Sequence, residues 1–347
     1  MSDTLLAAGI DGGATHTRAV LVTADGTIAG FGTAGPSNYD NVGEAAASEN
    51  LRGAVEGARR ASGRSLPAVA SMFLGMAGVV SRTDRETVRR MVLEHALAPP
   101  QGITVDHDIR IALAGALEGR EGIVLIAGTG SSTYGRRSDG RNHRTGWGFL
   151  LDDRGSGYFL GLQAMIATVM EADGRGSPTA LSRVVRERFR FSDIDDILRI
   201  VYHDRVPVAG IASLAPDVIR AAGNGDVVAE RILEEGSHEI TRMVAIVAER
   251  LEFTGEFAVT MTGGLVHHPG HYRDLIQAKI RRDVHGATIV APSLPPVIGA
   301  ALLALEGAGI PPTAALLKKL KEQVTLLPAG SGSTPEDPAQ SATNGNP

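Results

Sequence analysis

Apolar and polar positions alternate with glycine turns over the first part of the chain. Apolar stretches at residues 5–10, 18–22 and 27–31 are separated by a glycine turn and by Asp25-Gly26. Short apolar runs with such boundaries predict an antiparallel meander of three strands. Further along, the pattern predicts helices over 44–61, 84–98 and 109–118, and strands over 69–74 and 103–107.

The opening pattern then returns. Residues 122–127 form an apolar run, Gly128-Thr129-Gly130-Ser131 a turn, and 132–136 a returning strand with a hairpin turn after it. Two strand–turn–strand units indicate a duplicated architecture. The remaining segments are predicted as helices at 157–173, 179–189, 192–202, 211–223, 227–251, 297–307 and 313–326, and as strands at 257–262 and 288–291.

This order of elements predicts an α/β protein of two domains. We expect an N-terminal domain over residues 1–117, a C-terminal domain over 118–327, and a disordered tail over 328–347, which is rich in Pro, Gly and Ser.

Composition excludes several classes of function. Of 347 residues 43% are hydrophobic and 21% charged, the net charge is −5, and no run of Lys and Arg indicates nucleic-acid binding. No apolar run reaches the ~18 residues that span a membrane, and no leader pattern is present, so a cytoplasmic protein is expected. The chain has no cysteine, which excludes disulfides, thiolate metal sites, iron–sulfur clusters and cysteine nucleophiles.

Glycine motifs point to phosphate binding of a particular kind. No P-loop pattern is present. Gly30, Gly32 and Gly35 fit Gly-x-Gly-x-x-Gly, but Pro36 follows, where a dinucleotide fingerprint needs a helix.

The two glycine hairpins are better candidates, because consecutive small residues expose backbone N–H groups to an anion. Asp11, at the mouth of the first hairpin, could hold Mg²⁺ directly or through water. Hydroxyl donors are present at Thr15, Thr17, Thr129, Ser131 and Ser132. The alternative is that both are ordinary hairpins with glycine turns.

Three motifs, in their order, resemble those of the superfamily that unites sugar kinases, heat-shock chaperones and actin. Asp11-Gly12-Gly13-Ala14-Thr15 is similar to its first phosphate motif and Gly128-Thr129-Gly130-Ser131 to its second. Thr262-Gly263-Gly264 resembles its adenosine motif. The resemblance implies two ribonuclease-H-like (actin-like ATPase) domains that bind ATP and Mg²⁺ with a substrate in the cleft between them.

Other segments narrow the resemblance to the N-acetylglucosamine kinase group of the BadF/BadG/BcrA/BcrD-type ATPase family, over residues 5–307. They are Gly75-Met76-Ala77-Gly78, Gly146-Trp147-Gly148 with its apolar continuation, and Gly155-Ser156-Gly157-Tyr158. One branch of that family activates dehydratases through a cysteine-ligated iron–sulfur cluster, which a chain without cysteine cannot hold. A homodimer is the expectation for the family.

The family resemblance implies a carboxylate that accepts the proton of the attacking hydroxyl. We predict Asp108, directly after strand 103–107, where the family carries Asn-Asp and this chain has His107-Asp108. A helix cap is a compatible role for Asp108. Asp106 is the competing candidate because it lies on the same strand face.

The resemblance also implies sugar contacts. Asp153 matches the aspartate of a Gly-Asp-Glu-Gly-Ser segment, in which this chain has Asp152 and Arg154 instead of Gly and Glu. Gly78 and Asn38 are further candidates, with an Asx turn as the alternative for Asn38. Trp147, the only tryptophan, is predicted either to stack near the sugar or to pack in the core.

Histidines allow weaker predictions. His16 stands where relatives often carry Lys beside the phosphates, and a neutral imidazole supplies less positive charge. His267, His268 and His271 suggest a metal site, but no carboxylate is at ligand spacing and solvated loop histidines are the favoured interpretation.

The sequence therefore predicts an ATP-dependent kinase for N-acetylglucosamine, at its 6-hydroxyl, or for glucosamine. The alternatives are a kinase for another sugar or polyol, which the changes at Asp152 and Arg154 suggest, and a non-catalytic ATP- or sugar-binding sensor.

Overall fold

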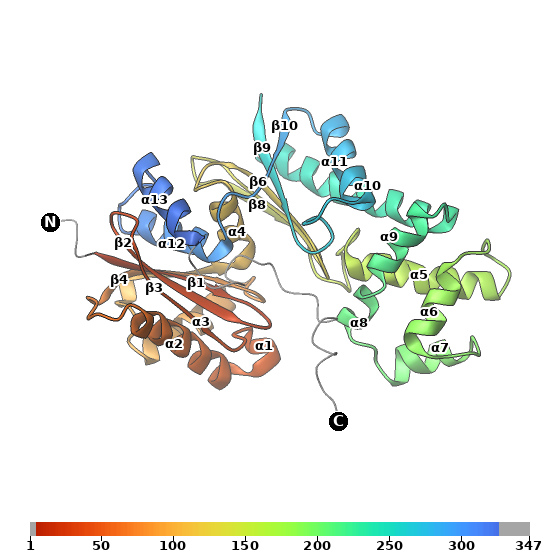
Figure 1. The fold of residues 1–347 in the computed structure, drawn as a ribbon, viewed down its shortest axis with the longest axis horizontal. Coiled ribbons are helices and arrows are strands. Elements are labelled where there is room, and N and C mark those ends of the chain that lie inside the picture. Colours follow the sequence, from red (N-terminus) through yellow and green to blue (C-terminus); the bar gives the residue numbers. More distant parts are fainter. Residues whose placement is uncertain (1–4, 326–347) are drawn as a thin grey trace. The chain divides into compact units, whose positions relative to one another are not determined.

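The computed structural model describes residues 5–325, which divide into two compact units (Figure 1). The first unit contains residues 5–122 and 291–325, and the second contains residues 123–290. Each unit is built around a mixed sheet of five strands covered by helices. This agrees with the predicted α/β class and with the predicted duplication.

The first sheet has the strand order β3-β2-β1-β4-β5. β1 pairs antiparallel with β2, and β2 with β3, whereas β1, β4 and β5 run parallel. Because parallel strands share one carboxyl edge, the ends of β1, β4 and β5 lie along the same side of the sheet. The strands are β1 (Leu6–Gly12), β2 (Thr17–Thr23), β3 (Ile28–Ala34), β4 (Val69–Met76) and β5 (Ile103–His107).

Helices cover both faces of this sheet. Leu6, Ala8 and Ile10 pack into a core with α2 and α3, and the alternate residue Ala7 packs into a second core with α4, α12 and α13. The period of two along β1 thus separates the two cores. The helices are α1 (Tyr39–Val42), α2 (Glu44–Ala61), α3 (Arg82–Glu94), α4 (Asp108–Ala116), α12 (Pro296–Gly307) and α13 (Ala314–Val324), with a short 3-10 turn at Pro100–Gly102.

Close packing explains the Gly-x-Gly-x-x-Gly pattern on β3. A Cβ atom at Gly30 would lie 2.0 Å from the Ala58 carbonyl oxygen, and one at Gly32 would lie 2.2 Å from the Ala54 carbonyl oxygen. Ala54 and Ala58 belong to α2, so these glycines let the helix backbone approach the strand. The motif therefore has a packing role and does not begin a dinucleotide site.

The predicted domain division needs a correction. Residues 291–325, assigned by the sequence to the C-terminal domain, belong to the first unit, and that unit extends to residue 122 instead of 117. α12 packs directly on β1, where a Cβ atom at Gly9 would lie 2.3 Å from the Ala301 backbone nitrogen. The Ser71 hydroxyl on β4 donates to the Ala304 carbonyl at 2.7 Å. An apolar helix with no polar face must be buried, and this sheet is what buries it.

The second sheet has the order β8-β7-β6-β9-β10, which matches the first sheet position by position. β6, β9 and β10 are parallel, and β7 pairs antiparallel with β8. The strands are β6 (Gly122–Ala127), β7 (Ser131–Arg136), β8 (Asn142–Thr145), β9 (Phe257–Thr262) and β10 (Ala287–Val290).

Most helices of the second unit agree with the prediction, and two do not. The predicted helix 211–223 is split into α8 and α9, because Pro216 is accommodated only in the first turn of α9. The predicted helix 192–202 is reduced to α7 and a π-helical turn at Arg199–His203. The helices are α5 (Gly157–Ala172), α6 (Leu181–Phe189), α7 (Asp196–Leu198), α8 (Val208–Ala212), α9 (Ala215–Gly223), α10 (Val227–Arg250) and α11 (His271–Asp283). The predicted tail, residues 328–347, lies outside the described residues.

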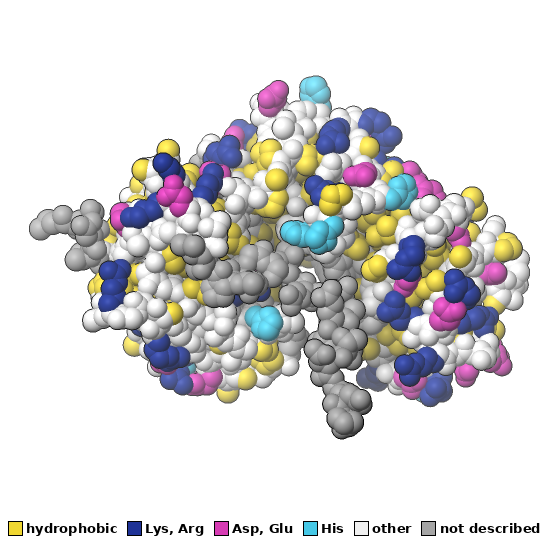
Figure 2. Space-filling model, viewed as in Figure 1, with side chains coloured by type: hydrophobic (Ala, Val, Ile, Leu, Met, Phe, Trp, Pro, Cys, Tyr) yellow, Lys and Arg dark blue, Asp and Glu magenta, His cyan; other side chains and the backbone are white. Residues whose placement is uncertain are grey.

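The surface carries charges of both signs. Lys and Arg are interspersed with Asp and Glu over the face in view, without one large basic patch (Figure 2). Within residues 5–325, no helix is both long and apolar enough to cross a membrane.

Gly9→Ala tests the packing of α12 on β1. The added methyl group meets backbone atoms of Ala301 that cannot move aside, so we expect unfolding free energy to fall by about 1–3 kcal/mol. Urea denaturation measures it. Gly223→Ala, in α9 with open space around it, is the matched control and should not destabilise the protein. An unchanged free energy in Gly9→Ala would contradict this packing.

Candidate active site

The first glycine turn (residues 12–17) joins β1 to β2 in the first unit. The Gly13 N–H donates to the His16 carbonyl at 2.9 Å, which closes the turn. A Cβ atom at Gly12 would lie 2.4 Å from the Met76 sulfur, so a side chain does not fit there. Thr15 and His16 are exposed, whereas Thr17 is buried and donates its hydroxyl to the Gly35 carbonyl at 2.7 Å. The Thr17 hydroxyl therefore shapes the turn, and the accessible hydroxyl is that of Thr15.

Asp11 lies one residue before this turn, on β1. Its register partner on β2 is Arg18, and the Arg18 guanidinium lies 3.6 Å from the Asp11 carboxylate. Burial, together with the charge of Asp108, raises the pKa of Asp11 to about 6, although Arg18 acts in the opposite sense. The two carboxylates lie at one edge of the sheet, because β1, β4 and β5 are parallel and Asp108 directly follows β5. Arg18 was missed in the sequence, although counting outward from the hairpin turn pairs it with Asp11.

Asp108 and Asp106 differ in their surroundings. Asp106 accepts hydrogen bonds from Arg85 at 3.0 Å, from Arg110 at 2.6 Å and from the His107 backbone at 2.9 Å. Burial alone would raise the pKa of Asp106, but His107, Arg110 and Arg85 lower it below its ordinary value. Such a carboxylate is a poor proton acceptor. Asp108 is the first residue of α4, where the helix dipole favours a carboxylate.

Asn38 and Gly78 come together in the first unit. Asn38 caps α1, since its side-chain oxygen accepts the Asp40 N–H at 3.1 Å, so the Asx-type geometry is present. Gly78 has φ 86°, and a Cβ atom there would lie 3.0 Å from the Asn38 side-chain oxygen. The first glycine turn is bonded to this segment, because the Gly13 carbonyl accepts the N–H groups of Ser37 and Asn38 at 3.1 and 3.3 Å.

The second glycine turn (residues 127–131) joins β6 to β7 in the second unit. Gly128 donates to the Gly130 carbonyl at 2.9 Å, and Thr129 is exposed. The Ser131 hydroxyl is directed inward and donates to the Arg154 carbonyl at 3.1 Å. Thr129 is thus the accessible hydroxyl-bearing residue of this turn, and the hydroxyl of Ser131 is engaged within the fold.

Gly263 and Gly264 follow β9 beside this turn. Gly263 has φ 106°, and a Cβ atom there would lie 2.4 Å from the Ala127 carbonyl oxygen. That carbonyl accepts the Leu265 N–H at 3.1 Å. The structure therefore brings together the segments predicted to bind phosphate and adenosine.

Asp153 lies in the second unit with its side chain largely buried. Burial raises the pKa of Asp153, whereas hydrogen bonds from the Ser131 and Gly148 backbone act in the opposite sense. Arg154, which replaces a family carboxylate, directs its guanidinium to Glu235 of α10 at 2.6 Å. Trp147 is 65% exposed, so it is not a core residue, and the Arg144 guanidinium stacks on its ring at 5.0 Å.

The histidines after Gly264 do not form a metal site. His271 contacts the Glu230 carboxylate at 2.8 Å, and the rings of His267 and His268 meet edge to face. Among the described residues, no three His, Asp or Glu side chains are grouped as metal ligands. Asp11, with Asp108 at the same edge of the sheet, offers oxygen donors of the kind that fit Mg²⁺, which usually takes one or two carboxylates together with phosphate oxygens and water.

Two sheets of the same strand order, each with a glycine turn after its first strand, define a protein of the actin-like ATPase fold. The chain belongs to the BadF/BadG/BcrA/BcrD ATPase family, whose model matches residues 8–304.

Named relatives and a solved structure resemble most of the chain. It is 31% identical to an N-acetylmuramic acid/N-acetylglucosamine kinase of Clostridium acetobutylicum, over 85% of this chain and 97% of that relative. It is 30% identical to an N-acetyl-D-glucosamine kinase of Dictyostelium discoideum, over 86% and 97%. A crystal structure from Chromobacterium violaceum, provisionally named an N-acetylglucosamine kinase, has a TM-score of 0.66 and 27% identity, covering 86% of this chain and 99% of that chain.

The pKa of Asp11 predicts a pH-dependent effect of Asp11→Asn. Native Asp11 binds a proton below about pH 6, whereas the unfolded chain stays ionised to about pH 4, so the contribution of this group to stability falls as pH rises between these values. Asparagine has no charge to bury. We expect the variant to be more stable than the parent by about 1–3 kcal/mol at pH 7, and by much less at pH 4.

Urea denaturation at both pH values measures this difference. Asp195→Asn, at an exposed carboxylate, is the matched control. An equal effect of Asp11→Asn at pH 4 and pH 7 would show that Asp11 has an ordinary pKa.

Proposed function

We propose that this protein is an ATP-dependent amino-sugar kinase that phosphorylates N-acetylglucosamine or glucosamine, with the 6-hydroxyl of the sugar as acceptor. The observation that carries the proposal is that Asp11, at the end of β1, and Asp108, directly after β5, lie at the same carboxyl edge of one parallel set of strands. A proton acceptor and a cation-binding carboxylate are the two acidic groups that phosphoryl transfer from ATP requires. The names of the relatives, all amino-sugar kinases, support the acceptor class.

Asp108 is the proposed general base. The sugar hydroxyl gives its proton to the Asp108 carboxylate as its oxygen forms a bond to the γ-phosphorus, and the bond to the β–γ bridging oxygen breaks with ADP as leaving group. Asp106 instead orders Arg85 and Arg110 around the end of β5, which fits its lowered pKa. In this proposal Asp108 removes the proton, and Asp106 positions the two arginines.

Backbone groups and a cation are the proposed phosphate ligands. N–H groups of Gly12, Gly13, Gly128 and Gly130 and the hydroxyls of Thr15 and Thr129 suit phosphate oxygens. Thr17 and Ser131 act through their backbone, because their hydroxyls are engaged elsewhere. Mg²⁺ held at Asp11 would neutralise charge that develops on the phosphates. Gly263 and Gly264 are the proposed adenosine contacts.

Asn38, Gly78, Trp147 and Asp153 are the proposed sugar contacts. A buried carboxylate at Asp153 and an amide at Asn38 are groups that hydrogen-bond hydroxyls, and an exposed indole suits stacking on a sugar ring. The proposal includes a homodimer located in the cytoplasm, with a small-molecule sugar as substrate and neither nucleic acid nor membrane as partner.

Asp108→Asn tests the base assignment. ADP release from MgATP is measured with N-acetylglucosamine, glucosamine, N-acetylmuramic acid, N-acetylmannosamine and glucose. We expect one or more amino sugars to stimulate release and the variant to lose about 10²–10⁴-fold in kcat, because the hydroxyl proton has no acceptor. ATP affinity, measured by calorimetry, should be preserved.

The same panel separates the alternatives. Stimulated release that survives in Asp108→Asn would contradict the base assignment. Stimulation by glucose alone would indicate a kinase for another sugar. ATP binding without stimulated release from any sugar would indicate a sensor.

Trp147 provides a spectroscopic test of the acceptor site, since it is the only tryptophan. If the indole stacks on the sugar, N-acetylglucosamine should change the emission intensity or wavelength in a saturable manner, with a midpoint close to the KM for the sugar. Glucose serves as the comparison ligand. Saturation of the enzyme by kinetics with no change in emission would place the sugar away from Trp147.

A further inference from the structure

The Asp153 turn (residues 153–156) holds its backbone in an unusual conformation. Asp153 has φ 53° and Gly155 has φ 80°, both in the left-handed region. The Ser156 N–H donates to the Asp153 carbonyl at 3.1 Å, which closes the turn. A residue other than glycine with positive φ persists only where its surroundings fix it. The direction of the Asp153 carboxylate therefore depends on what holds this turn.

One side of the turn is attached to the second glycine turn. The Ser131 hydroxyl donates to the Arg154 carbonyl at 3.1 Å, and the Ser131 backbone bonds to the Asp153 carboxylate. Beyond the turn, Gly157 donates to the Gly128 carbonyl at 2.7 Å. These bonds connect the turn to the proposed phosphate contacts, but they leave its opposite side to other residues.

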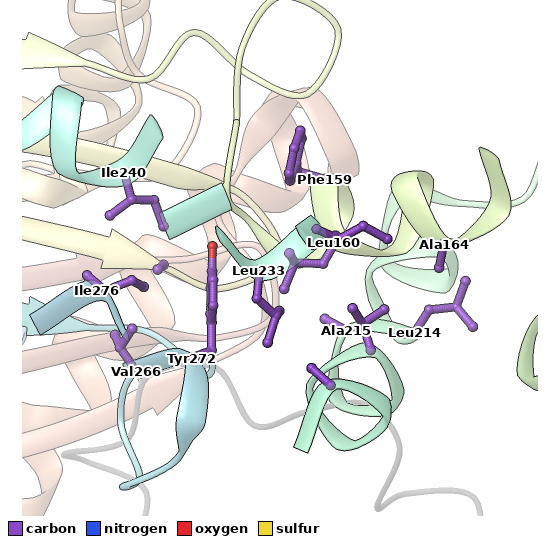
Figure 3. Packing of buried hydrophobic residues seen from close by; sticks show 14 of the residues in the cluster. Phe159, Leu160, Ala164, Leu214, Ala215, Leu233, Ile240, Val266, Tyr272 and Ile276 are labelled. Atoms are coloured by element: carbon purple, nitrogen blue, oxygen red, sulfur yellow. The ribbon is translucent and has the colours of Figure 1, made fainter. Parts of the chain in front are cut away.

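Tyr272 of α11 holds the opposite side. Its hydroxyl donates to the Gly155 carbonyl at 2.8 Å, and the side chain is 1% exposed. Figure 3 shows the Tyr272 ring among Leu233 and Ile240 of α10 and Ile276 of α11. This packing leaves the hydroxyl little freedom to move, so the bond to Gly155 is directed by the core.

Glycines make room for this contact. A Cβ atom at Gly236 of α10 would lie 2.6 Å from the Tyr272 hydroxyl oxygen, and one at Gly155 would lie 2.4 Å from the Gly236 carbonyl oxygen. The Tyr272 hydroxyl thus needs glycine at position 236, and the close approach of the turn to α10 needs glycine at position 155. Three elements distant in sequence meet at one buried hydrogen bond.

Arg154 forms a second attachment on the same side. Guanidinium nitrogens of Arg154 lie 2.6 Å from the Glu235 carboxylate and 4.0 Å from the Glu239 carboxylate. The guanidinium carbon lies 5.1 Å from the centre of the Phe159 ring. Both glutamates belong to α10. Arginine, which has a planar guanidinium, can make ion pairs and stack on a ring at once. The side chain is therefore engaged by α10 and α5.

We propose that Tyr272 and Arg154 are positioning residues that fix the Asp153 turn and so direct the Asp153 carboxylate toward the acceptor, an inference that rests on the proposed function for the role of Asp153. Tyr272 acts through the Gly155 carbonyl, and Arg154 acts through Glu235 and Glu239. The Arg154 guanidinium then serves to hold the turn through its ion pairs on α10, and does not add a cation to the sugar site.

Tyr272→Phe is the decisive variant, because it removes one hydroxyl and keeps the ring. We expect kcat/KM for the amino sugar to fall by about three- to tenfold, the scale of a single buried hydrogen bond. The Kd for ATP in the absence of sugar should change less than about twofold, since the second glycine turn keeps its own hydrogen bonds. Tyr202→Phe, at a 72% exposed ring, is the matched control.

Arg154→Glu tests the second attachment by charge. It places a carboxylate against Glu235 and Glu239, so we expect kcat/KM for the sugar to fall, again with little change in the Kd for ATP. Glu235→Arg in the same chain should restore part of the loss, which a role in sugar contact would not predict. Arg183→Glu, at an exposed arginine of α6, is the control.

Hydrogen–deuterium exchange over residues 152–158 measures the turn itself, whether or not the protein turns over a sugar. Faster exchange in Tyr272→Phe than in Tyr202→Phe is the expected result, and equal exchange would overturn the proposal. Equal losses for sugar and for ATP would also overturn it, because they indicate a general structural effect. If no amino sugar is phosphorylated by the parent enzyme, the proposed function fails, and the exchange result still decides whether Tyr272 fixes the turn.

Discussion

Within each unit, main-chain hydrogen bonds from a glycine turn are the constraint on which the candidate site residues of that unit depend. In the first unit, the Gly13 carbonyl accepts the N–H groups of Ser37 and Asn38. In the second, the Gly128 carbonyl accepts the Gly157 N–H, directly after the Asp153 turn. In each unit, therefore, the segment suited to phosphate is bonded through its backbone to the segment suited to an acceptor. Substitution of side chains can alter what is bound while these bonds keep the two segments in register.

Glycine is needed at the turns because little space is left beside the backbone. Gly12 has no space for a side chain beside Met76, and Gly263 has none beside the Ala127 carbonyl. Gly263 is required by the close approach of two backbones, whereas the space beside Gly12 is filled by the Met76 and Ser37 side chains. Because the neighbours are strands of a sheet and the residues that follow them, an added methyl group would act on the architecture and on the site at once.

Much of the fold could be predicted because it is local in the sequence. The strand β1, the turn after it and the strand β2 lie in one continuous segment, where the apolar runs and the glycine turn between them can be seen directly. The same pattern recurs in β6 and β7. The division into units could not be predicted in the same way. α12 follows the second sheet in the chain but is buried on the first, through long-range contacts such as those of Gly9 with Ala301 and Ser71 with Ala304. A pattern of apolar residues predicts that a helix is buried, but it does not predict against which sheet.

Prediction from the sequence is limited in the same way for single side chains of the candidate site. Asp11 and Asp108 are predicted as site residues because each directly follows a predicted strand, and their roles stay predictions. Thr17 and Ser131 were predicted as phosphate donors from their type and spacing, but their hydroxyls bond to the Gly35 and Arg154 carbonyls instead. Tyr272 had no signal at all, since its partner Gly155 lies 117 residues away in the chain.

Arg154 shows why a departure from a family pattern must be judged with its neighbours. In the sequence, a guanidinium in place of a carboxylate changes the charge beside Asp153. In the fold, the guanidinium of Arg154 pairs with Glu235 and Glu239 on α10 and lies over the Phe159 ring. The carboxylate of Asp153 keeps its burial and its backbone hydrogen bonds. The Arg154 charge is therefore paired with α10, and the carboxylate of the turn is that of Asp153.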